Sequence, residues 1–169
     1  MNANVRCLLQ NLDNLSTSAG LAELVRVVKA SRITLDDVRE FAHFDPVRYH
    51  RELIVKTASY VIYLIGWLPL QKSPIHNHRG SQCCVTVLHG TAVETIFTRN
   101  PDGSFETHTD RYGVGSVFSG QDSDIHTVEN TNEAGEGLLT LHVYRPALTQ
   151  MELFDWVEGR LVVRQPPAA

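Results

Sequence analysis

The segment SPIHNHRGSQCCVTVLHGTAVETIF, residues 73–97, carries a His-x-His pair, His76 and His78, ahead of runs rich in β-branched residues. Side chains two residues apart on an extended segment point to the same face, so both imidazoles are expected to lie side by side. Two neutral imidazoles in that arrangement suit a transition metal. The segment therefore predicts β-structure that carries a metal site.

A third candidate ligand, His126, lies about fifty residues further along the chain, within the expected strand 124–130. Three ligands from two strands of a barrel can occupy one face of a metal ion. A histidine that stands alone is more often a surface or core residue that forms hydrogen bonds. We apply this interpretation to four other histidines, which are His43, His50, His89 and His108.

Short segments rich in Val, Ile, Tyr and Phe follow one another from Tyr49 onward, and turn-forming residues separate them. Evenly spaced strands of this kind are typical of a barrel or a sandwich. Before residue 45, apolar residues recur at helical spacing within 18–30, and Thr34 can cap a second helix. The predicted fold class is mainly β with short N-terminal helices. Strands are expected at 51–57, 60–68, 74–78, 83–89, 92–99, 104–111, 115–118, 124–130, 138–145, 151–156 and 160–164.

The length of 169 residues suits a single domain over 1–169, with a helical part over 1–44 and a β-barrel over 45–169. Lys and Arg number 15 against 19 Asp and Glu, and the net charge of -4 offers no basic field for a phosphate backbone. The longest apolar run, 60–70, is shorter than the roughly 20 residues that cross a bilayer. We therefore expect neither nucleic acid nor a membrane as a partner. No secretory signal is visible, which predicts a cytoplasmic protein.

The spacing of these motifs resembles that of the cupin superfamily, whose second motif is a His four residues before an Asn, here His126 and Asn130. Cys83, seven residues before Gly90, stands where most cupins carry a glutamate ligand. That replacement, together with the segment 73–97, is similar to the cysteine dioxygenase family of thiol dioxygenases. The resemblance runs from about Tyr49 to Asp155 and implies a cupin β-barrel of the jelly-roll type.

The resemblance implies that His76, His78 and His126 hold one Fe(II) per chain. An all-histidine site adds no negative charge to the metal, which stays Lewis acidic and can hold a thiolate. The activity implied is that of an oxidoreductase which uses O2 to convert a small thiol carboxylate to its sulfinic acid. L-cysteine to cysteine sulfinate is the leading case, and 3-mercaptopropionate or another mercapto-carboxylate is the alternative.

Two further pairs of residues match family positions around the iron. His142 and Tyr144 are two apart on an expected strand and so face the same way, and they match a catalytic His and Tyr. Arg51 matches the arginine that binds the substrate carboxylate, for which a planar guanidinium supplies two parallel hydrogen bonds. The resemblance extends to Tyr49 as a residue that lines the same cavity.

Cys83 matches the family cysteine that forms a thioether with the catalytic tyrosine, here Tyr144. Strand alternation then sends Cys84 to the opposite face. The chain has three cysteines, an odd number, which disfavours a disulfide framework.

Two readings from other classes remain open. A cupin could bind a metal without turnover, but such a module has no need for a His and a Tyr beside the metal. A zinc hydrolase would also use three imidazoles, yet no general-base carboxylate appears at a recognisable spacing. The expected partners are a small thiol and O2, and a monomer is compatible with the sequence.

Overall fold

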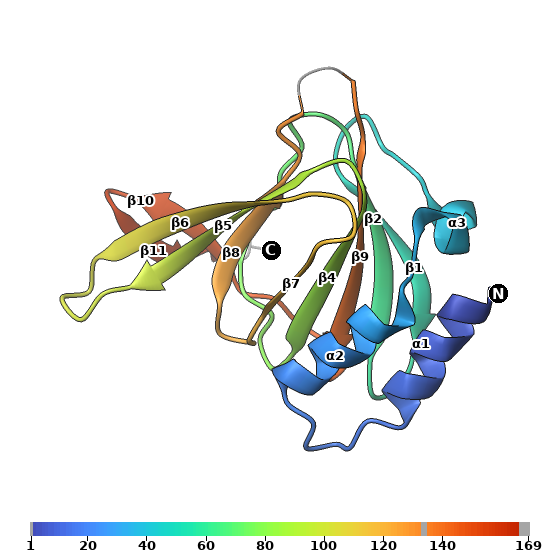
Figure 1. Ribbon diagram of the computed structural model, residues 1–169. Coiled ribbons are helices and arrows are strands. Elements are labelled where there is room, and N and C mark those ends of the chain that lie inside the picture. Colours follow the sequence, from blue (N-terminus) through green and yellow to red (C-terminus); the bar gives the residue numbers. More distant parts are fainter. Residues whose placement is uncertain (1, 133–134, 166–169) are drawn as a thin grey trace.

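The computed structural model describes residues 2–132 and 135–165, which form two antiparallel sheets with helices against one of them (Figure 1). Within the described residues one sheet has the strand order β1-β2-β9-β4-β7 and the other has β11-β10-β3-β8-β5-β6. Helices α1 and α2 lie on the first sheet, while β5, β6, β10 and β11 extend away from it as an arm (Figure 1). The fold class predicted from the sequence, mainly β with short N-terminal helices, is confirmed.

The strands follow the expected positions closely. Strand β7 begins and ends two residues later than expected, and β3 ends at His76 although a strand over 74–78 was expected. The strand ends early because the amide of Asn77 donates to the carbonyl of Glu152, and the amide of Ser81 donates to the carbonyl of His78 in a tight turn. The bounds are β1 His50–Lys56, β2 Val61–Trp67, β3 Ile75–His76, β4 Gln82–His89, β5 Ala92–Arg99, β6 Phe105–Tyr112, β7 Val117–Gly120, β8 Ile125–Glu129, β9 Leu138–Arg145, β10 Leu153–Val157 and β11 Arg160–Val163.

The helices are α1 Ala3–Asp13, α2 Leu21–Ser31, α3 Leu35–Val38 and the 3-10 turn η1 Arg39–Phe41. The sequence predicted the second and third of these, but not α1. This helix buries Val5, Leu8 and Leu12 and begins at Asn2, whose side-chain oxygen accepts from the amide of Asn4 at 3.2 Å. Only three side chains of this helix are buried, and packing on the sheet stabilises it. A local sequence pattern does not reveal that packing.

The apolar side chains form two layers, one on each face of the five-stranded sheet. The outer layer packs the helices against the sheet and includes Leu8, Leu24 and Leu141. The inner layer lies between the two sheets and includes Val85 and Phe118. Because successive side chains on a strand alternate between faces, β2, β4, β7 and β9 contribute to both layers.

No helix in the described ranges is long and apolar enough to cross a membrane. The cytoplasmic location and the division into a helical part and a barrel within one domain stay predictions, and residues 1, 133–134 and 166–169 of that domain lie outside the described part.

Candidate metal centre

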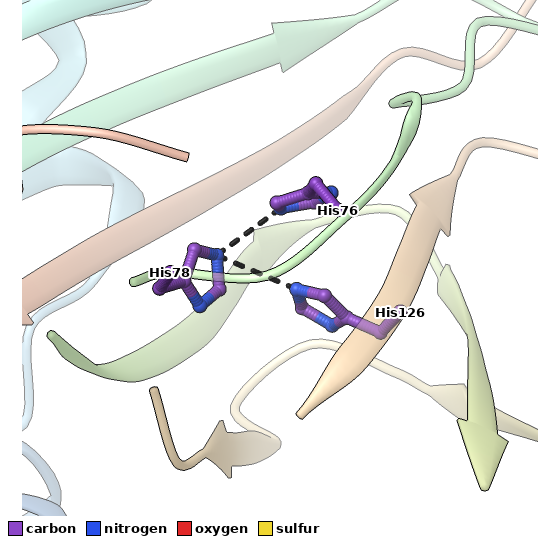
Figure 2. Close-up of side chains that lie close together, drawn as sticks. All are labelled: His76, His78 and His126. Carbon is purple, nitrogen blue, oxygen red and sulfur yellow. Dashed lines mark hydrogen bonds between the residues drawn. The ribbon is translucent and has the colours of Figure 1, made fainter. Parts of the chain in front are cut away.

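Three histidine side chains converge between the two sheets (Figure 2). His76 and His126 are direct partners in the pairing of β3 with β8, and His78 follows two residues after His76. The Nε2 atom of His78 lies 3.1 Å from Nε2 of His76 and 3.4 Å from Nε2 of His126. Two nitrogens bound to one metal at roughly 2.0 to 2.1 Å lie about 2.8 to 3.4 Å apart, so the ring nitrogens already have the spacing of metal ligands.

The other ring nitrogen of two of these histidines is held by an oxygen. The Nδ1 atom of His76 donates to the carbonyl oxygen of Pro74 at 2.9 Å, and that of His126 donates to Oε1 of Glu94 at 2.6 Å. With the proton on Nδ1, the Nε2 lone pairs point toward the common centre. Nδ1 of His78 is buried with no hydrogen-bond partner among the described residues.

Glu94 is a site residue that the sequence analysis missed. It is 4% exposed and comes from β5, where it lies diagonally across from His126 on β8. A carboxylate behind a ligating imidazole orients the ring and raises its basicity. The sequence contains a signal for this role, because Glu94 is the one acidic residue of the expected strand 92–99. Alternation places it on the same face as Ala92 and Ile96.

Burial keeps His76 and His78 neutral. Desolvation, together with repulsion between neighbouring imidazoles, lowers the pKa of His76 to about 3 and holds the pKa of His78 far below its usual range. These two neutral rings leave their Nε2 lone pairs free at physiological pH. The three convergent ring nitrogens fit a divalent transition metal, in agreement with the metal site expected from the sequence.

The residue between His76 and His78 is held by hydrogen bonds on the face that points away from the imidazoles. Asn77 points away from the rings; its Nδ2 donates to Oε2 of Glu152 at 2.9 Å, and its Oδ1 accepts from the Glu152 amide at 3.1 Å. Arg79 adds an ion pair of 3.2 Å to the same carboxylate. These contacts tie His76 and His78 to the segment that leads into β10.

A chain of hydrogen bonds runs along β9 beside the histidines. The hydroxyl of Tyr144 lies 3.2 Å from Nδ1 of His142, and Nε2 of His142 lies 2.9 Å from Oγ1 of Thr140. The indole N–H of Trp67, on β2, donates to the same Thr140 oxygen at 2.9 Å. Burial lowers the pKa of His142 and raises that of Tyr144, so both side chains are neutral. The sequence analysis singled out neither Thr140 nor Trp67.

The two adjacent cysteines lie in different layers. Cys83 belongs to the inner layer and is paired with Tyr144 across β4 and β9, while Cys84 belongs to the outer layer beneath the helices. Burial raises the pKa of the Cys83 thiol well above its ordinary value, and a hydrogen bond with Tyr144 acts against that rise. Burial raises the pKa of Cys84 to about 12.

Arg51 and Tyr49 line a small cavity of about 20 Å³, which the three histidines and Tyr144 line as well. The guanidinium carbon of Arg51 is 4.6 Å from the centre of the Tyr63 ring, and its Nη1 is 4.0 Å from the sulfur of Met151. Within the described residues Arg51 has no carboxylate partner, so its charge is available to a ligand. Tyr49 stacks on Trp67 with ring centres 4.5 Å apart.

The family model described as cysteine dioxygenase type I matches residues 3–157. The chain belongs to the cysteine dioxygenase family. Cysteine dioxygenase type 1 of Danio rerio is 28% identical over 151 residues, which cover 85% of this chain and 74% of that protein. The Homo sapiens protein of the same name is 28% identical over 124 residues, which cover 70% of this chain and 62% of the human protein.

Membership of the cysteine dioxygenase family agrees with the family resemblance and with the enzyme class predicted from the sequence, an oxidoreductase of the thiol dioxygenase type. The family model reaches back to residue 3, whereas the resemblance was expected to begin near Tyr49. Helix α1 is therefore part of the family pattern.

Solved structures agree with the fold. A protein of Thermus thermophilus superposes with a TM-score of 0.56 at 19% identity, covering 68% of this chain and 99% of its own. An uncharacterized conserved protein with a double-stranded β-helix domain from Klebsiella pneumoniae gives 0.58 at 20% identity, covering 73% and 91%. The double-stranded β-helix is the barrel architecture that the sequence predicts.

Proposed function

We propose that the protein is an iron-dependent thiol dioxygenase that converts a small thiol carboxylate to its sulfinic acid, with L-cysteine as the leading substrate. The observation that carries the proposal is the convergence of the three Nε2 atoms in a cavity that Tyr144 and Arg51 also line. Addition of both atoms of O2 to sulfur oxidises it by four electrons, and O2 accepts those four electrons. The reaction therefore needs no external reductant.

In this proposal His76, His78 and His126 hold one iron ion per chain. Bound iron would supply positions for the thiolate and for O2 and would activate the oxygen. Glu94 and the Pro74 carbonyl keep the protons of two imidazoles on the outer nitrogen. Histidine ligands add no negative charge to a metal ion, so a negatively charged substrate thiolate is a favourable further ligand.

Arg51 is proposed to bind the carboxylate of the substrate. A guanidinium binds a carboxylate through two parallel hydrogen bonds, which set both distance and orientation. Tyr63 beneath the guanidinium and Met151 beside it limit the positions that the side chain can take. Tyr49 lines the same cavity.

Tyr144 is proposed to donate a proton into the site. The Thr140 oxygen accepts from Trp67 and lies 2.9 Å from Nε2 of His142, to which it is proposed to donate its own proton. His142 then carries its proton on Nδ1 and donates it to the oxygen of Tyr144. With its oxygen accepting from His142, the Tyr144 hydroxyl can turn its proton from the Cys83 sulfur to a ligand in the cavity. Cys83, on the neighbouring strand, is proposed to restrain the tyrosine through a thioether.

An amine-free mercapto-carboxylate such as 3-mercaptopropionate is the second candidate substrate. The cavity is lined by histidines, aromatic rings, Ser73, Met151 and aliphatic side chains, with Arg51 as its charged group. No described carboxylate lines it to receive the ammonium group of cysteine. A substrate that carries only a thiol and a carboxylate would leave no group unmatched.

Metal analysis combined with O2 uptake tests the proposal. We expect about one iron per chain in protein purified without added metal, and uptake of one O2 per sulfinate formed. L-cysteine, 3-mercaptopropionate and cysteamine separate the candidate substrates. His126→Ala should lose iron and activity, whereas His108→Ala, which removes an exposed imidazole on β6, should keep both. Bound metal without O2 uptake on any thiol would instead support a non-catalytic metal-binding cupin.

A further inference from the structure

A second group of metal-ligating side chains lies outside the barrel, where the sequence analysis expected only isolated histidines. Nε2 of His50 is 2.9 Å from Oε2 of Glu52, and Nδ1 of His43 is 3.5 Å from the same oxygen. One ligand atom of each residue lies within 4.8 Å of the others. All three side chains are partly exposed, so water can complete a coordination shell.

The placement of these residues follows from strand geometry. His50 and Glu52 flank Arg51 on β1, so alternation turns them to the opposite face of the strand from the proposed substrate-binding arginine. His43 comes from the segment between η1 and β1 and reaches them across the neighbouring strand β2. Its ring lies edge-on to that of His50, with centres 5.8 Å apart.

Gly66 allows the His43 segment to come this close. It is the partner of His50 in the pairing of β1 with β2. A Cβ atom at this position would overlap the backbone carbonyl oxygen of His43 and contact Phe44. The missing side chain therefore lets the backbone of His43 rest directly on the strand, which holds its imidazole above His50 and Glu52.

We infer that His43, His50 and Glu52 form a second metal site, which binds a divalent transition-metal ion of the zinc type on the outer face of β1. Two imidazoles and one carboxylate are a donor set that zinc uses in open sites, with water in the remaining position. Calcium and magnesium prefer all-oxygen sites and are poorly matched. The hydrogen bond from His50 keeps the pKa of Glu52 below its usual value, which favours the ionised ligand.

Zinc binding to the purified, iron-loaded protein tests this site. Equilibrium dialysis against Zn²⁺ without chelator, with zinc and iron measured together, should show one zinc per chain bound while the iron content stays constant. His43→Ala and Glu52→Gln should each weaken zinc binding by at least about tenfold, the smallest loss typical when even a supporting partner of a ligand is removed. Zn²⁺ should also raise the melting temperature of the parent protein more than that of either variant.

Two further variants separate this site from other sources of zinc binding. His108→Ala is the matched control, because His108 forms a 3.2 Å pair with Asp110 but has no third ligand in a metal-binding group of the described residues. It should bind zinc like the parent. In His126→Ala, which removes a ligand of the histidine centre, zinc binding at the second site should persist. Zinc uptake that displaces iron, or that is equal in the parent and His43→Ala, would overturn the inference.

Discussion

Cys83 lies directly opposite Tyr144 in the ladder between β4 and β9, and both side chains are buried in the layer between the sheets. Directly opposed residues of antiparallel strands place their Cβ atoms about 4.5 to 5.5 Å apart. A thioether between the cysteine sulfur and the ring carbon next to the tyrosine hydroxyl would join the two strands. Such a bond restrains the phenol and so reduces the orientations that its hydroxyl must search.

We predict that this thioether forms when iron-loaded protein turns over thiol in air, with O2 accepting the two electrons. Peptide mass analysis should find the segments around Cys83 and Tyr144 joined, with the loss of two hydrogens. Cys83→Ser should keep dioxygenase activity at a reduced rate, while Tyr144→Phe should lose more because it removes the hydroxyl itself. Cys84→Ser is the control, since Cys84 faces the helices, and it should retain the crosslink. A linkage through Cys84 would contradict the assignment.

Arg51→Ala should impair turnover of carboxylate substrates selectively. Loss of the bidentate contact removes the binding and orientation that the guanidinium gives to the substrate carboxylate. The expected result is a large fall in kcat/KM for L-cysteine and a small one for cysteamine, which has no carboxylate. Arg48→Ala serves as the control, because Arg48 is exposed beside Arg51 but does not line the histidine cavity. Equal losses on both thiols would indicate a structural role for Arg51.

Glu94→Gln should weaken metal retention without unfolding the barrel. Glutamine has the size of glutamate but lacks its negative charge. In the parent protein, Oε1 of Glu94 lies 2.6 Å from Nδ1 of His126. Loss of such a supporting group typically lowers metal affinity by about 10- to 100-fold. Competition with a chelator measures the change in affinity. Glu106→Gln, on the exposed face of β6, should leave the affinity unchanged, and an unchanged affinity in Glu94→Gln would remove Glu94 from the metal centre.

Tyr60 should make the free energy of unfolding depend on pH in the alkaline range. Its hydroxyl donates to Asp13 at 2.9 Å and joins the residue before β2 to the end of α1. Burial together with that carboxylate raises the pKa of Tyr60 to about 12 from 10.0. The folded state thus favours the protonated phenol. This stabilisation is complete below pH 10 and is lost as the pH rises toward 12.

Denaturant unfolding at several pH values checks this prediction. Tyr60→Phe should lower the free energy of unfolding by about 1 kcal/mol at neutral pH, the typical value of one hydrogen bond. The difference between the parent and the variant should then shrink between pH 10 and 12. A difference that stays constant over this interval would show that the hydroxyl does not titrate as the buried contact requires.

Local patterns in the sequence were sufficient for most of the fold. The strands β1 to β11 were expected within about three residues of their observed bounds because turn residues and β-branched runs are local signals. Helix α1 was not predicted, because its three buried residues form a packed face only when the helix lies on the sheet. The early end of β3 also escaped prediction, because it depends on the contact between Asn77 and Glu152.

The sequence by itself determined the family and the candidate ligands His76, His78 and His126, because the motif spacing and the alternation of a strand are properties of adjacent residues. Only the tertiary structure decided which groups support them. Glu94 reaches His126 through the register of β5 and β8, and Trp67 reaches Thr140 through that of β2 and β9. His43 lies close to Glu52 because its backbone packs directly on Gly66 of β2. Such contacts join residues distant in the chain, and strand pairing and close packing, which no short stretch of sequence encodes, set their geometry.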